Sequence, residues 1–199
     1  GLSDTLLRMM NAHAARMKAP PILPFITADV MAFAVLFVLF MAGRMGNPTL
    51  YDASAAQLSP MLGLLNTLIL VTSSWLVVLG LHAARQGDRE HLRRYLLLAM
   101  VVGAGFAVTK VYEYHGKFEL GITLLTNEFF SYYFILTGLH FLHFLVGMGV
   151  LALMRTKARA EPLGEPLIGW IISGGIYWHM VDLLWIILFP LLYLVGRVV

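Results

Sequence analysis

The sequence contains no cysteine and few charged residues, and both scarcities exclude classes of protein. Without cysteine there can be no structural disulfide, thiolate metal site or thiol nucleophile. Charged residues make up only 13%, about half the share of ordinary soluble domains, whereas hydrophobic residues make up 59%. A soluble domain of 199 residues cannot bury that much apolar surface, so lipid must solvate much of it. The net charge of +3 comes mainly from loops between apolar stretches and does not indicate nucleic-acid binding.

Five apolar stretches predict an all-α protein, an integral membrane bundle of five transmembrane helices. Each exceeds the ~20 residues that an α-helix needs to cross the hydrocarbon core. The predicted spans are residues 22–42, 61–83, 92–112, 129–154 and 167–195. Prolines and glycines separate them, and Gly116 and Gly121 fall in the predicted third loop. Residues 22–199 are therefore treated as one five-helix membrane domain.

The distribution of lysine and arginine predicts the orientation of the bundle. Ten of the fourteen basic residues fall on the side of the N-terminus and four on the other side. The excess of basic residues marks the cytoplasmic side, so the N-terminus is expected in the cytoplasm and the C-terminus in the periplasm. Residues 1–21 interleave leucine and methionine with basic residues, which predicts a cytoplasmic amphipathic segment on the anionic inner leaflet.

Several ionisable side chains fall within or at the ends of the predicted spans, where they are energetically costly and therefore informative. They are Asp29, Glu113, His140, His143, His179 and Asp182. His140 and His143 share one helix face, as do His179 and Asp182. Helix rise puts His140 and His179 near the midplane, where they can face each other. Asp29 is expected at the depth of His143 and paired with it, with a polar group of the second span or with a lipid headgroup.

These polar residues allow three interpretations. His140, His143 and His179 could be ligands of a redox metal or haem in a stand-alone membrane protein. Scattered carboxylates and histidines also suit a proton pathway or a small proton-coupled transporter. The third interpretation is structural: buried polar pairs fasten helices together, or recognise a lipid headgroup or a neighbouring subunit. The structural interpretation is the default, with no catalytic, cofactor-binding or metal residue assigned.

Four short motifs lie in the second to fifth predicted spans or directly after one of them. In chain order they are Asn66-Thr67 with Ser73-Ser74, Glu113-Tyr114, Thr137-Gly138 with His140 and His143, and Tyr177-Trp178-His179 with Asp182 and Trp185. Together they resemble the signatures of subunit III of the haem–copper oxidases. The resemblance covers roughly residues 22–196.

The sequence departs from the long, mitochondrial-type form of that family. That form has seven spans, and the first two have no counterpart here. It also carries a membrane-buried glutamate where this sequence has Asp29. The five spans, Asp29, the Lys110-x-x-Glu113-Tyr114 run and the Tyr132-Tyr133-Phe134-x-Leu-Thr run look closest to the subunit III-like accessory protein encoded with nitric oxide reductases. Five-span quinol-oxidase subunits are the next most similar.

The resemblance implies a non-catalytic accessory subunit in the bacterial inner membrane. Its partner would be the catalytic subunit of a cytochrome c oxidase, quinol oxidase or nitric oxide reductase, which holds haem together with copper or non-haem iron. The family has no cofactor of its own, stabilises that partner in aerobic or nitric oxide respiration, and binds phospholipids between its helices. The intramembrane motif residues are then Asp29, Asn66, Glu113, Tyr114, Thr137, His140, His143, Trp178, His179 and Asp182. The candidate lipid-headgroup ligands are Arg93, Arg94 and Arg155.

Overall fold

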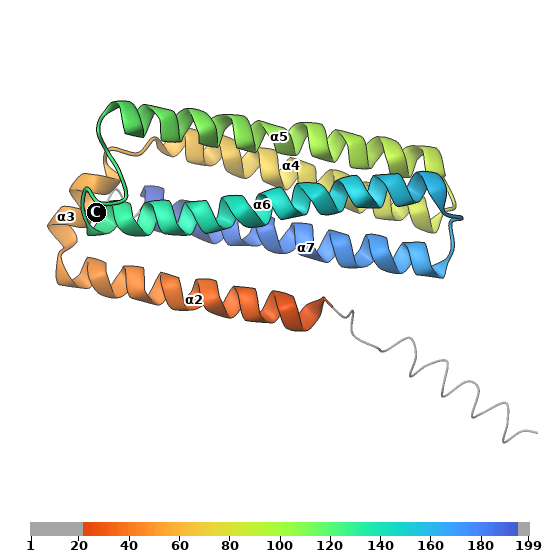
Figure 1. The fold of residues 1–199 in the computed structure, drawn as a ribbon, viewed down its shortest axis with the longest axis horizontal. Coiled ribbons are helices and arrows are strands. Elements are labelled where there is room, and N and C mark those ends of the chain that lie inside the picture. Colours follow the sequence, from red (N-terminus) through yellow and green to blue (C-terminus); the bar gives the residue numbers. More distant parts are fainter. Residues whose placement is uncertain (1–21, 195–199) are drawn as a thin grey trace, which may run out of the picture.

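The computed structural model describes residues 22–194, and every regular element within that part of the chain is helical (Figure 1). The elements are α2 (Leu23–Gly46), α3 (Pro48–Ala55), α4 (Pro60–Arg85), α5 (Arg89–Glu119), α6 (Glu128–Ala160), α7 (Glu165–Phe189) and the π-helical turn η1 (Pro190–Leu194). Five helices are long and apolar enough to cross a membrane, which confirms the predicted all-α membrane architecture. The predicted amphipathic segment, 1–21, lies outside the described residues.

Four helices begin at a side chain that accepts a hydrogen bond from the backbone N–H three residues later, a common way to satisfy the first amides of a helix. These N-caps are Asn47 for α3, Ser59 for α4, Asp88 for α5 and Asn127 for α6. Hydrogen bonding, first of all from the backbone of His91, holds the pKa of Asp88 below its usual value. The loops before these N-caps lie where the positions of glycine and proline predicted loops, with one exception.

That exception is Gly116, which lies inside α5 and not in a loop. Helix α5 continues to Glu119, seven residues past the predicted end, and the turn follows at Gly121 with φ 71°. Hydropathy locates only the part of a helix that is in hydrocarbon, whereas the helix itself extends into the polar region. In this extension the Lys117 ammonium donates a hydrogen bond of 2.6 Å to the carbonyl of Gln57.

The first predicted loop contains the short helix α3, which hydropathy did not indicate. Its Tyr51 is buried and its ring meets Phe40 of α2 and Phe129 of α6 edge to face. Burial, followed by the nearby charge of Glu128, raises the pKa of the Tyr51 hydroxyl above its usual value. Helix α3 therefore ties the end of α2 to the start of α6 through an aromatic contact.

Helices α4 to α7 form a four-helix group, in which α4 packs on α5 and α7 while α6 packs on the same two helices. Helix α2 runs along the outside of α6 and α7 (Figure 1). Only Phe33 and Phe40 are buried among its 24 residues, so most of its surface is open to lipid or to another protein.

Small residues let α6 and α7 approach closely, as in many membrane bundles. The fully buried indole of Trp178 lies so near Gly147 that a Cβ at that glycine would be 2.7 Å from the ring. On the same helix Gly149 faces open space. Gly147 is therefore needed for the α6–α7 contact, and Gly149 is not.

Candidate functional site

The predicted site residues do not form one site but separate polar clusters inside the bundle. The largest, which we name the Lys110 cluster, consists of Lys110 and Glu113 of α5 with Tyr193 of η1. The Lys110 ammonium lies 2.7 Å from Glu113 Oε2 and 2.8 Å from Tyr193 Oη. The Tyr193 hydroxyl in turn donates to both oxygens of Glu113, at 2.7 and 2.9 Å. This buried ion pair thus ties the C-terminal turn to α5.

Aromatic rings enclose the Lys110 ammonium. It lies 4.7 Å from the ring centroid of Trp185 and 5.4 Å from that of Tyr133. Such cation–π contacts stabilise a cation that has lost its water. Nearby, the hydroxyls of Tyr114 and Thr137 are hydrogen-bonded at 2.7 Å, which joins α5 to α6. Two predicted motifs, Glu113-Tyr114 and Thr137-Gly138, therefore meet in space.

A second polar contact joins α2 to α6. His143 Nε2 lies 3.4 Å from Asp29 Oδ2, with both side chains partly buried. Asp29 therefore has the expected neighbour, at ion-pair distance and without a well-formed hydrogen bond. Because His143 Nδ1 lies 2.8 Å from the carbonyl of Leu139, that nitrogen carries a proton.

The other two histidines of the bundle interior have different partners. His140 is fully buried, and its Nε2 donates a 2.8 Å hydrogen bond to the carbonyl of Val181 on α7. His179 Nδ1 pairs with the Ser74 hydroxyl of α4 at 2.8 Å. Within residues 22–194 no three His, Asp or Glu side chains come close enough to hold a metal. The structure does not gather His140, His143 and His179 into one ligand set.

The remaining motif residues also lie in the interior. Asn66 of α4 accepts a hydrogen bond from Thr109 of α5, and both Asp182 and Trp178 of α7 are buried. Asp182 Oδ1 and Trp178 Nε1 find no hydrogen-bond partner within the described part of the chain. The Asn66–Thr109 hydrogen bond can therefore fasten α4 to α5.

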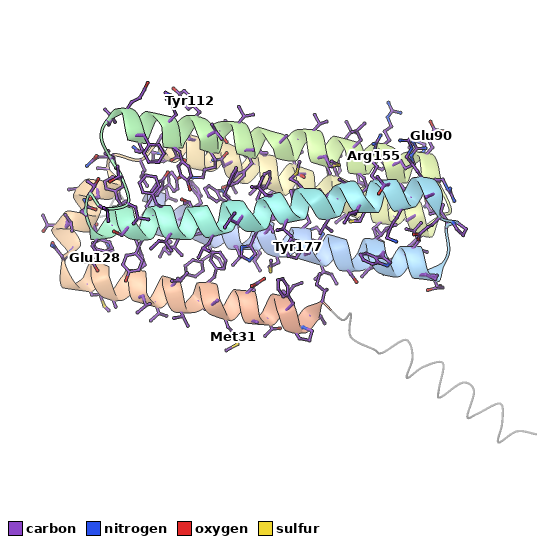
Figure 2. The ribbon with its side chains drawn as sticks, viewed as in Figure 1. Met31, Glu90, Tyr112, Glu128, Arg155 and Tyr177 are labelled. Atoms are coloured by element: carbon purple, nitrogen blue, oxygen red, sulfur yellow. The ribbon has the colours of Figure 1, made fainter. Side chains whose placement is uncertain are left out.

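The predicted headgroup ligands Arg93, Arg94 and Arg155 do come together. They line a cavity of about 570 Å³ at one end of α5 and α6, with Arg89, Glu90 and Leu97. Figure 2 shows Glu90 and Arg155 at this same end of the bundle. We call this cavity the arginine pocket.

Sequence reasoning left two members of the Lys110 cluster out of the predicted site. The spacing of three residues between Lys110 and Glu113 is a recognisable signal for an ion pair on one helix face. Tyr193 lies 80 residues further along the chain than Glu113, and no local pattern could have paired them.

Comparison with known proteins supplies the family. A family model described as cytochrome c oxidase subunit III matches residues 13–197. The chain is 33% identical over 177 residues to cytochrome c oxidase subunit 3 of Corynebacterium diphtheriae, covering 86% of this chain and 84% of the relative. It is 30% identical over 178 residues to cytochrome c oxidase subunit 3 of Thermostichus vulcanus, covering 88% and 86%.

Proposed function

The chain belongs to the cytochrome c oxidase subunit III family, and from this premise we propose that it is a non-catalytic accessory subunit of a respiratory haem–copper oxidase. It packs against the catalytic subunit, which holds the haem and copper, and prolongs the activity of that subunit. It also binds phospholipid along its membrane face. The protein lies in the bacterial inner membrane with its N-terminus in the cytoplasm, as the distribution of basic residues favours.

The observation that carries this proposal is the use made of the family-motif residues. Glu113, Tyr114, Thr137 and His140 all form contacts between helices in the interior of the bundle. Buried polar contacts of this kind hold transmembrane helices in a defined arrangement. A bundle whose polar groups serve its own packing, and whose α2 is largely uncovered, suits a subunit that supports a neighbour.

The open surface of α2 supports lipid and partner binding. Met31, Val35 and Val38 are between 59% and 67% exposed on this helix, and an apolar surface in a membrane must be covered by acyl chains or by protein. The Asp29–His143 contact lies on the opposite, inward side and keeps α2 against α6. Helix α2 thus offers one face to the bundle and the other to lipid or to the catalytic subunit.

The test is purification of the complex in mild detergent through a tag on this chain. We expect haem to co-purify in a fixed ratio, and deletion of the chain to shorten the time for which the enzyme stays active during turnover. If the chain purifies without haem, and the enzyme keeps full activity and lifetime without it, the proposal is wrong. Consumption of oxygen or of nitric oxide by the purified complex then identifies the substrate of the partner. Oxygen is expected from the relatives, and nitric oxide would favour the reductase branch indicated by Asp29 and the Lys110-x-x-Glu113-Tyr114 run.

A further inference from the structure

A series of tryptophan and tyrosine rings runs through the interior of the bundle. The ring centroids are 6.1 Å apart for Trp185 and Tyr193, 6.4 Å for Tyr193 and Tyr133, and 6.2 Å for Tyr133 and Tyr114. Trp178 lies seven residues before Trp185, two turns of α7 or about 10.5 Å along the axis. Phenylalanine rings fill the space between the two indoles. We name these tryptophans and tyrosines the Trp–Tyr chain.

The Trp–Tyr chain is shielded from lipid and water over most of its length. Trp178, Trp185, Tyr133 and Tyr193 are each no more than 1% exposed, and Tyr114 is partly buried. In a protein without cysteine, indole and phenol are the side chains that most readily lose a single electron, and an electron moves easily between rings this close. Packing alone explains why aromatic rings are buried. A chemical role requires in addition a group that accepts the proton which a phenol loses on oxidation.

Tyr193 has such an acceptor in Glu113. Its hydroxyl donates to both carboxylate oxygens, at 2.7 and 2.9 Å, the distance at which a carboxylate can act as a base. The hydrogen-bond partners of Tyr114 and Trp185 are neutral threonine hydroxyls, which do not retain an added proton. A phenol that has lost an electron becomes a strong acid. The oxidised state of the chain is therefore most stable at Tyr193, where the proton can leave.

Two features around Tyr193 favour a neutral radical. The Lys110 ammonium lies 2.8 Å from Tyr193 Oη, and its charge opposes a cation radical on any of the rings around it. A radical that has given its proton to Glu113 carries no charge of its own and avoids this repulsion. Glu113 also lines a cavity of about 240 Å³ near the end of α5, together with His115 and Lys117. Water in that cavity can exchange the proton with the medium.

We propose that Tyr193 is a redox-active tyrosine, with Glu113 as its proton acceptor and the Trp–Tyr chain as its route for electrons. A one-electron oxidant takes an electron from Tyr193 through the neighbouring rings. The phenolic O–H bond breaks, the proton forms an O–H bond on Glu113, and a neutral tyrosyl radical remains. A water-soluble one-electron reductant then returns the electron, and the proton goes back to the phenolate oxygen.

In the assembled enzyme the oxidant is a haem of the catalytic subunit in a high-potential oxidised state. This part of the inference rests on the proposed function, which supplies the haem. An oxidising equivalent that is not used in the reaction of the catalytic subunit would pass to Tyr193 and be reduced there. The catalytic subunit would then be spared oxidative damage to its own side chains.

The experiment generates the oxidant with light, on the whole 199-residue chain in lipid nanodiscs. Because the chain has no cysteine, a ruthenium photo-oxidant on Leu125→Cys is attached at one position, in the exposed turn between α5 and α6. Every sample also carries Tyr112→Phe, since Tyr112 is 72% exposed and open to direct oxidation. A laser flash with a sacrificial electron acceptor oxidises the ruthenium, and transient absorption and electron paramagnetic resonance detect the radical. We expect a neutral tyrosyl signal that forms more slowly in D₂O than in H₂O.

Three variants and a control assign the radical and its base. Tyr193→Phe should abolish the signal, and Glu113→Gln should slow its formation about 100-fold, the lower end of what a positioned base contributes. Should Glu113→Gln fail to fold, Lys110→Met with Glu113→Leu removes the whole ion pair and should also slow formation, because the acceptor is again missing. Tyr177→Phe is the matched control. Tyr177 is also buried, but its hydroxyl donates at 3.3 Å to a backbone carbonyl, which does not take up a proton, so signal and rate should be unchanged.

The outcomes distinguish this inference from the proposed function. An unchanged yield in Tyr193→Phe, or an unchanged rate in the variants without the Glu113 carboxylate, would overturn the redox role of Tyr193. In the purified complex, Tyr193→Phe should keep its haem and lose activity faster in hydrogen peroxide than the parent, and an equal lifetime would overturn the haem as the oxidant. Absence of haem from the parent complex contradicts the proposed function alone, because the light reaction needs no partner.

Discussion

Replacement of Glu113 by Gln should strongly destabilise the bundle, because it breaks a buried ion pair. The substitution keeps the shape of the side chain and removes the negative charge 2.7 Å from the Lys110 ammonium. Lys110 is 1% exposed, so neither water nor a headgroup can replace the lost carboxylate. Breaking a buried ion pair by removing one partner costs about 3–5 kcal/mol. For a chain of this size that corresponds to a fall in melting temperature of roughly 6–20 °C.

The measurement is reversible unfolding in mixed detergent and dodecyl sulfate micelles, followed by the helical circular dichroism signal. Glu119→Gln is the matched control. Glu119 also has a potential ion-pair partner, His115 at 3.6 Å, but Glu119 is 70% exposed and His115 is exposed as well. The control should change the free energy of unfolding by less than about 0.5 kcal/mol. A loss in Glu113→Gln no larger than in the control would refute the reasoning.

A triple variant tests whether the cost comes from the unpaired charge or from the loss of the polar group. Lys110→Met, Glu113→Leu and Tyr193→Phe together replace every partner in the Lys110 cluster by an apolar side chain. Because Lys110, Glu113 and Tyr193 are removed together, none of the three is left buried without its partner, and the triple variant should be within about 1–2 kcal/mol of the parent. If it is less stable than Glu113→Gln, the cluster stabilises the bundle by its net attraction, and the assignment of the penalty to the unpaired lysine is wrong.

Three further predictions concern packing, orientation and acid sensitivity. Gly147→Ala should cost about 1–3 kcal/mol in the same unfolding assay, because its methyl group would overlap the indole packed on α6, whereas Gly149→Ala faces open space and should cost nothing. Because the chain has no cysteine, an impermeant maleimide should label Leu125→Cys in intact cells and Gln86→Cys only after permeabilisation; the reverse pattern would invert the proposed orientation. Asp88 has a pKa below that of the unfolded chain, so its cap stabilises above the unfolded value of ~3.9 and is lost as pH falls through the lower folded value. Asp88→Asn keeps a good cap and should reduce this loss of stability in acid, and an unchanged acid transition would exclude Asp88 as its source.

The number and type of the membrane helices could be read from the sequence because hydrophobicity alone separates lipid-exposed from aqueous segments. The ends of the helices were harder to predict from the sequence. Helix α5 passes through Gly116 because tertiary contacts, such as that of Lys117 with Gln57, continue the helix beyond the apolar stretch. Helix α3 was missed for a similar reason, since its Tyr51 is buried by α2 and α6 and not by a hydrophobic run of its own.

The same limits apply to the polar clusters. Depth along two helices was enough to name His143 as one of three expected neighbours of Asp29, because rise per residue is a property of every α-helix, and the structure shows His143 at 3.4 Å. The rotation of each helix about its axis is not readable in this way, since the spans have no strong amphipathic pattern. For that reason the partners of His140 and His179 emerged only from the structure, as Val181 and Ser74.

The peripheral position of α2 has a consequence for how the protein is made. This helix leaves the ribosome before the other four spans, yet its neighbours in the structure, α3, α6 and α7, are all synthesised later. In the bilayer it therefore lacks its contacts with α6 and α7 until those two helices have been inserted. Its strongly apolar sequence keeps it stable in lipid before those contacts form. Helix α2 is thus expected to enter the membrane before the helices on which it packs.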